Sequence, residues 1–193
     1  MRNYSMKIPA HIYLLASQDR FHARFVQLVR DPRGVAFSNT KEVARQGSRA
    51  DKPMRTTRTP RKTATKWLWF NLSFGVLRAL RHPFVRLRYE AFVREPEEAL
   101  RMCASQAGRA LTAEDLGFLE GRTARLPPGH LVAGNRMRHL TGPIELRIDE
   151  AWRLGLPERD RRTVELVTAP LLRRYGYARG GAAITDAGDD LEG

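Results

Sequence analysis

The stretch RFVQLVRDPRGVAFS, residues 24–38, constrains the fold more than any other part of this 193-residue chain. Its first six residues, 24–29, form a short β-branched and aromatic run, which is typical of a strand. Asp31 and Pro32 follow one residue later, and such a pair is typical of a helix start. The aspartate carboxylate accepts hydrogen bonds from the unpaired backbone N–H groups of the first turn, and proline has no backbone N–H that would stay unpaired. The stretch therefore predicts a strand, a tight turn and a helix over residues 32–45.

Strand and helix patterns alternate along the rest of the chain. Residues 67–80 are apolar nearly all round, which predicts a buried helix. Residues 84–89 are typical of a second strand, and amphipathic spacing predicts helices over 96–107 and 157–175. A hydroxyl cap followed by early acids predicts a further short helix that starts at Thr112. This alternation favours the α/β fold class with a parallel sheet.

Length and composition bound the class of protein. The length predicts one domain, which we expect over residues 1–177, and a disordered acidic tail over residues 178–193. No run approaches the ~20 apolar residues that span a bilayer, and the apolar run 12–16 is shorter than the ~7–15 residues of a signal-peptide core. We therefore expect a cytoplasmic protein. The single cysteine, Cys103, excludes an intramolecular disulfide and a Cys-rich metal site, and we expect it in the core.

Positive charge is concentrated in one segment. The chain has 34 Lys and Arg against 21 Asp and Glu, a net charge of +13. Residues 41–66 hold nine of these cations and only two carboxylates, a net charge of +7. Such a balance favours an anionic partner. Within this segment, residues 46–65 lack apolar periodicity and predict a basic mobile loop, which is either a solvated linker or a lid that attracts anions.

Arg30 and Ser38 are candidates for an anion site. Arg30 comes at the carboxyl end of the predicted strand 24–29, where open α/β sheets bind ligands. Ser38 lies about two helical turns beyond Asp31 and can share the face from which Arg30 projects. A guanidinium fork with a hydroxyl suits a phosphate. The residues alone leave a second interpretation open, in which Arg30 pairs with Asp31 or a nearby carboxylate and Ser38 is buried.

Several motifs occur in the order found in the sulfotransferase family. The segment VQLVRDPRGVAFSNTKEVAR, residues 26–45, resembles the family's Arg-Asp-Pro-Arg motif and the serine that follows it. Other segments are similar to further family motifs, in chain order: MKIP at 6–9, YLL at 13–15, LRYEAFVREP at 87–96, HLVAGNRMR at 130–138, DEAW at 149–152 and LLRRYGY at 171–177. The resemblance spans about residues 7–177, and the order of these motifs along the chain makes it specific.

The resemblance implies a fold and a reaction. The fold would be a P-loop-like, three-layer α/β fold with a parallel sheet. The reaction would transfer a sulfuryl group from 3′-phosphoadenosine 5′-phosphosulfate, an anionic nucleotide, to a hydroxyl or amine of a small-molecule or glycan acceptor. No metal is implied. The basic excess of the chain matches the charge of such a donor.

The resemblance also implies residues that bind the donor. Arg30 and Ser38 would hold its 3′-phosphate, and Tyr89 would lie near its adenine. Three residues of a later loop would close over the same phosphate: Gly134, Asn135 and Arg138. Trp67 and Asn71 stand where the family often has a Trp and an Asn on a long helix, and for Trp67 we expect a role in the core.

Two residues near the N-terminus are candidates for catalysis. Lys7 aligns with a family lysine, and a cation there would stabilise charge that accumulates as the sulfuryl group leaves. A solvated lysine near the terminus is the alternative. His11 is the nearest candidate for a general base, and a structural or solvated histidine is the alternative.

The sequence departs from the family at its N-terminus. There the family has a strand followed by a Ser/Gly/Thr-rich loop, whose N–H groups hold the 5′-phosphosulfate, and residues 1–29 contain no match to it. We therefore expect a truncated member that lacks this strand and loop, with an unpaired edge on strand 24–29 and weak or no activity. The alternative is a noncatalytic remnant that binds a nucleotide or polyanion. Specific nucleic-acid binding is disfavoured because residues 41–66 lack interleaved aromatics.

Overall fold

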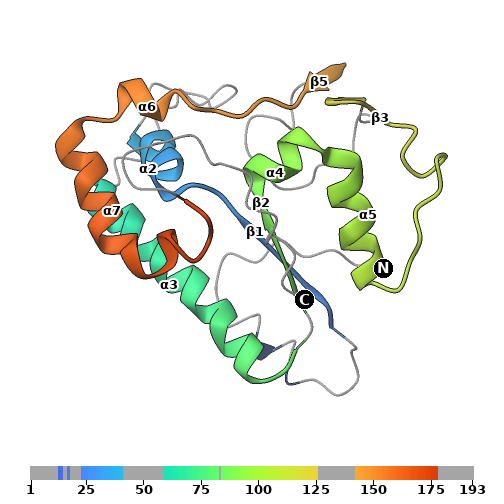
Figure 1. Ribbon diagram of the computed structural model, residues 1–193, viewed down its shortest axis with the longest axis horizontal. Helices are drawn as coiled ribbons and strands as arrows, with labels where there is room; N and C mark the ends of the chain where they lie inside the picture. Colours follow the sequence, from blue (N-terminus) through green and yellow to red (C-terminus); the bar gives the residue numbers. More distant parts are fainter. Residues whose placement is uncertain are drawn as a thin grey trace, which may run out of the picture. The chain divides into compact units, whose positions relative to one another are not determined.

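The computed structural model of the chain describes residues 13, 14, 17, 23–40, 59–82, 84–125 and 142–177 (Figure 1). They divide into two compact units, unit 1 within residues 1–86 and 149–193 and unit 2 within residues 87–148. Unit 1 contains β1 (Phe25–Val29), α2 (Pro32–Thr40), α3 (Pro60–Ala79), the start of β2 (Phe84–Arg88), α6 (Trp152–Gly155) and α7 (Glu158–Leu172). Unit 2 contains α4 (Tyr89–Arg94), α5 (Pro96–Gln106), β3 (Leu119–Glu120), β4 (Thr123–Arg125) and β5 (Pro143–Glu145).

The strand and helix predicted around Asp31 are confirmed. β1 alternates buried and exposed side chains and pairs with β2 in a small parallel sheet. The Asp31 carboxylate accepts a hydrogen bond from the backbone N–H of Arg33 at 2.8 Å. Asp31 therefore caps the N-terminus of α2, as the Asp31–Pro32 pair predicts. α2 extends to Thr40, and residues 41–45 of the predicted helix lie outside the described residues. Helices with a small parallel sheet fit an α/β architecture.

α3 differs from its prediction in two ways. It begins at Pro60, where the hydroxyl of Thr59 accepts the backbone N–H of Lys62 at 3.4 Å, so residues 60–65 are helical and the predicted loop cannot extend to 65. The cap and a proline at the first helical position explain this earlier start. The remainder of the predicted loop, residues 46–58, lies outside the described residues. Only one side of α3 is buried, because its described neighbours α7 and α2 pack against that side.

The core of unit 1 lies between α3, α7 and β1. Its largest cluster contains Val29, Trp67, Leu171, Leu172, Tyr175 and Tyr177. A second cluster joins Phe25 of β1 to Phe74 and Leu77 of α3. On α7, Val164, Leu171 and Leu172 are buried and Val167 is partly buried, as the amphipathic spacing of residues 157–175 predicts. After α7 the chain turns at Gly176, whose φ of 73° is the left-handed conformation that glycine adopts without strain.

The described part of unit 2 contains the helices α4 and α5 and a small antiparallel sheet. The predicted strand 84–89 ends at Arg88, and α4 begins at Tyr89. The helix predicted at 96–107 is α5, where Cys103 is half-buried rather than in the core, and burial raises the pKa of its thiol. The helix predicted at Thr112 is instead a turn. The backbone N–H and the hydroxyl of Thr112 donate to the Asp115 carboxylate there, and these two bonds lower the pKa of that carboxyl.

The antiparallel sheet of unit 2 has the order β3-β4-β5. Leu119 pairs with Ala124, and Ala124 pairs in turn with Ile144. The sequence did not predict these strands, because two or three residues are too few to show alternation. None of the described helices combines the length and hydropathy that a membrane crossing requires.

Candidate functional site

Arg30 lies directly after β1 and is held by a carboxylate from a distant part of unit 1. Its Nη2 atom donates to Oδ2 of Asp149 at 3.1 Å, and the Arg30 side chain stays 27% exposed. The other Asp149 oxygen, Oδ1, accepts the backbone N–H of Ala151 at 3.2 Å, next to α6. The carboxylate partner is therefore Asp149, and the pairing leaves part of the guanidinium open to solvent.

Arg33, the second arginine of the motif, is buried in an ion cluster. Its guanidinium donates to Asp31 through Nη2 at 2.7 Å and Nε at 3.0 Å, and its Nη1 donates to Glu165 of α7 at 2.9 Å. Burial by itself would lower the pKa of Arg33, but the hydrogen bonds and charges of Asp31 and Glu165 outweigh it and raise that pKa. The guanidinium also stacks over the Trp152 ring at 4.5 Å. Arg33 thus fixes the turn after β1 to α6 and α7.

Gly34 permits the close approach of Trp152 to α2. A Cβ atom at Gly34 would lie 3.2 Å from Cδ1 of Trp152 and 3.5 Å from Nε of Arg30. A side chain here would press on Trp152, because 3.2 Å is tighter than ordinary van der Waals distance, whereas 3.5 Å from Arg30 is an ordinary contact. The glycine therefore lets the Trp152 ring lie against the first turn of α2, beside the Arg30 guanidinium.

Trp67 anchors the backbone of Arg30 from the core. Its indole Nε1 donates to the carbonyl oxygen of Arg30 at 3.0 Å, while its ring packs in the largest core cluster. The expected core role of Trp67 is therefore observed, together with a direct bond to the segment that carries Arg30. Asn71, one turn further along α3, donates through Nδ2 to the Trp67 carbonyl at 2.8 Å.

A buried polar network runs from Asn71 to the sheet. Gln27 of β1 donates through Nε2 to Oδ1 of Asn71 at 2.9 Å, and its Oε1 accepts from Nε of Arg86 at 3.1 Å. The Arg86 guanidinium lies over the Tyr175 ring at 4.4 Å. Sequence reasoning missed this network. The signal that could have indicated this network is Gln27, a polar residue at a buried position of an otherwise apolar strand.

Ser38 is exposed on α2, so the interpretation in which it is buried is wrong. Ser38 and Arg30 both belong to the β1–α2 segment of unit 1. Tyr89 belongs to unit 2, where its hydroxyl donates to the carbonyl of Arg147 at 3.2 Å. Five candidates lie outside the described residues and stay predictions: Lys7, His11, Gly134, Asn135 and Arg138.

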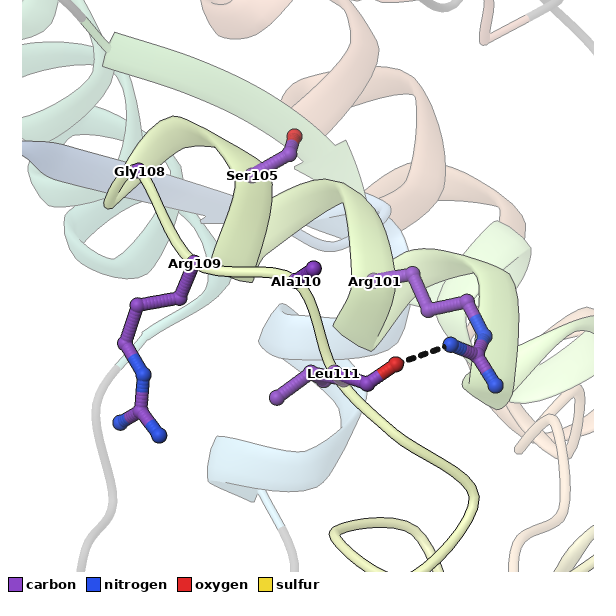
Figure 2. A pocket seen from close by; sticks show the side chains of 6 residues that line it. All are labelled: Arg101, Ser105, Gly108, Arg109, Ala110 and Leu111. Atoms are coloured by element: carbon purple, nitrogen blue, oxygen red, sulfur yellow. Dashed lines mark hydrogen bonds between the residues drawn. The ribbon is translucent and has the colours of Figure 1, made fainter.

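The cavity at the end of α5 contains none of the predicted site residues. It has a volume of about 440 Å³ and is lined by Arg101, Ser105, Gly108, Arg109, Ala110 and Leu111 (Figure 2). Arg101 donates to the carbonyl of Leu111 and to Glu97, so its charge is already paired. In the part of the chain that the structure describes, no group of His, Cys, Asp and Glu side chains has the arrangement of a metal site.

Comparison with known proteins identifies the family. The model of the sulfotransferase family matches residues 7–113, a stretch that includes β1, α2 and α3. Carbohydrate sulfotransferase 7 of Mus musculus is 32% identical over 102 residues, which are 53% of this chain and 20% of the mouse protein. The chain thus spans about a fifth of the length of that curated relative. No solved structure matches. Since the family match covers more than half of the sequence, the chain belongs to the sulfotransferase family.

Proposed function

We propose that this chain takes part in sulfuryl transfer from 3′-phosphoadenosine 5′-phosphosulfate to a hydroxyl or amine of a small-molecule or glycan acceptor. The observation that carries the proposal is Arg30, a partly exposed guanidinium at the carboxyl end of β1 within the stretch that matches the family. A glycan acceptor is supported by the name of the mouse relative. The three-layer, P-loop-like fold is part of the same proposal.

The residues around Arg30 fit a phosphate. The Arg30 side chain stays 27% exposed while its Nη2 donates to Asp149, and Ser38 is exposed on α2. A 3′-phosphate would accept from both, since a guanidinium and a hydroxyl are complementary donors for its oxygens. In the proposal Tyr89 lies near the adenine. The three residues of the later segment, Gly134, Asn135 and Arg138, close over the phosphate.

The chemical step in this proposal needs a cation and a base. As the bond between sulfur and the bridging oxygen breaks, negative charge accumulates on the nucleotide 5′-phosphate, and Lys7 would stabilise it. His11 would accept the proton from the attacking acceptor group. Both assignments rest on the family resemblance, and the cytoplasmic location likewise stays a prediction.

Replacing Arg30 with alanine is expected to remove nearly all affinity for adenosine 3′,5′-bisphosphate, the desulfated form of the donor. The loss should be at least ~1.5–3 kcal/mol, because the bond lost is one between two charged groups. Ser38→Ala should cost less, about 1 kcal/mol, since one neutral donor is lost. Calorimetric titration of the purified chain measures both.

The matched control is Arg162→Ala, which removes an exposed arginine of α7 and should leave binding unchanged. If the Arg30 variant binds as tightly as the parent chain while its circular dichroism is native, the donor site is wrongly assigned. Binding without turnover of the phosphosulfate donor would favour the noncatalytic alternative. Sulfuryl transfer to a test sugar would support the enzyme.

Replacing Asp149 with asparagine is expected to strengthen bisphosphate binding by roughly 1 kcal/mol, about fivefold. The Asp149 carboxylate bonds to Arg30 and carries the same sign of charge as the phosphate, whereas asparagine has similar size and no charge. Because Asp149 is partly exposed, solvent screening keeps the effect modest. The same titration measures it. Weaker binding would show instead that Asp149 is needed to orient Arg30.

A further inference from the structure

The outward side of α3 carries a continuous apolar stripe. Trp69 is 69% exposed, and Leu72, Val76 and Leu80 are 43%, 47% and 57% exposed. Their spacing of three, four and four residues places them on one face of the helix. We call Trp69, Leu72, Val76 and Leu80 the outer stripe. Single exposed apolar residues are ordinary, but an aligned set with a tryptophan indicates a contact surface.

The outer stripe is separate from the core of unit 1. The opposite side of α3 supplies Trp67, Phe74 and Leu77 to the core and packs against α7 and α2. Tyr13 packs against the second core cluster, and its hydroxyl donates to the carbonyl of Ser73 at 2.7 Å. The neighbouring Leu14 is 61% exposed.

The charged residues of α3 and its last turn are all positive. Residues 60–81 contain five cations and no carboxylate. Lys62 and Lys66 come seven and three residues before Trp69, so they lie on the same face. Together with Thr59, Arg61 and Thr65 they line a shallow cavity of about 560 Å³. Among the residues that the structure describes, neither lysine forms an ion pair with a carboxylate.

We propose that this face of α3 docks on an anionic lipid surface. An apolar stripe with an exposed tryptophan and flanking lysines is the combination that lies at a bilayer interface, with the indole at headgroup depth and the cations at lipid phosphates. A second copy fits less well. A symmetric contact through this face would bring two copies of a face with the same positive charge, carried by Lys62 and Lys66, against each other, which repels. The docking is peripheral and does not depend on the proposed donor site.

The test is flotation of the full chain with vesicles at low salt. We expect it to float with vesicles of phosphatidylcholine that contain about one third phosphatidylserine, and much less with phosphatidylcholine alone. The double variant Trp69→Ser, Leu80→Ser and the single variant Lys62→Glu should each reduce the bound fraction roughly tenfold. The matched controls are Leu166→Ser and Arg159→Glu on α7, where Leu166 is 72% exposed, and both should bind as the parent chain does.

Tryptophan emission gives a second readout of the same face. Trp67 and Trp152 are buried, so a blue shift and quenching by brominated lipid should come from Trp69 and disappear in Trp69→Phe. The proposal is overturned if the parent chain does not float with either vesicle. It is also overturned if the stripe variants bind as Leu166→Ser does, or if the stripe variants only convert a dimer to a monomer in sedimentation.

Discussion

Replacing Arg33 with alanine lowers the free energy of unfolding by about 3–5 kcal/mol, the cost of leaving buried carboxylates without their counter-charge. The Arg33 side chain is almost fully buried, and both of its ion-pair partners, Asp31 and Glu165, are largely shielded from water. The variant also loses the guanidinium stacked on Trp152. Urea unfolding followed by circular dichroism measures the change.

The control for Arg33 is an ion pair with a similar N···O distance and a far more exposed arginine. Arg162 donates to Glu158 at 2.8 Å, but its side chain is 74% exposed. Arg162→Ala should therefore change stability by less than about 1 kcal/mol. A triple variant, Arg33→Met with Asp31→Asn and Glu165→Gln, should recover much of the loss because no uncompensated charge remains. Equal costs for Arg33→Ala and Arg162→Ala would contradict the buried cluster.

Local sequence signals predicted the elements that local chemistry determines. The strand before Arg30 and the cap of α2 depend on side-chain alternation and on one carboxylate beside one proline, and both are found. The exposed side of α3 could not be predicted in this way. The apolar sequence of α3 shows which of its residues can be buried. Which of them are buried depends on the helices that pack against α3, and these are α2 and α7.

The partners within the candidate site are set by the tertiary fold. Arg30 and Asp149 are separated by 119 positions, and Arg33 and Glu165 by 132, so no spacing rule links them. The sequence offered Asp31 or a nearby carboxylate as a partner for Arg30. Arg30 does pair with a carboxylate, that of Asp149, while Asp31 bonds the Arg33 backbone and guanidinium two residues away. The same limit applies to domain organisation. One domain is expected from length, while the described residues cluster into two units.

Replacing Trp67 with alanine is expected to lower the free energy of unfolding by about 3–5 kcal/mol, as other deletions of buried tryptophans do. The ring is 8% exposed and packs with Val29, Leu171 and Tyr175, so its loss leaves a cavity where β1, α3 and the end of α7 meet. The variant also leaves the Arg30 carbonyl without its indole donor. Urea unfolding of the full chain measures the loss.

Trp67→Phe separates packing from anchoring. Phenylalanine keeps most of the apolar contact but has no N–H, so the stability cost should fall to about 1–2 kcal/mol. The bond to the Arg30 carbonyl is lost, and bisphosphate affinity should fall because the backbone that carries Arg30 is less firmly held. Trp69→Phe on the exposed side of α3 is the matched control and should change neither quantity. If Trp67→Phe binds as the parent does, the indole bond only stabilises the core and does not position Arg30.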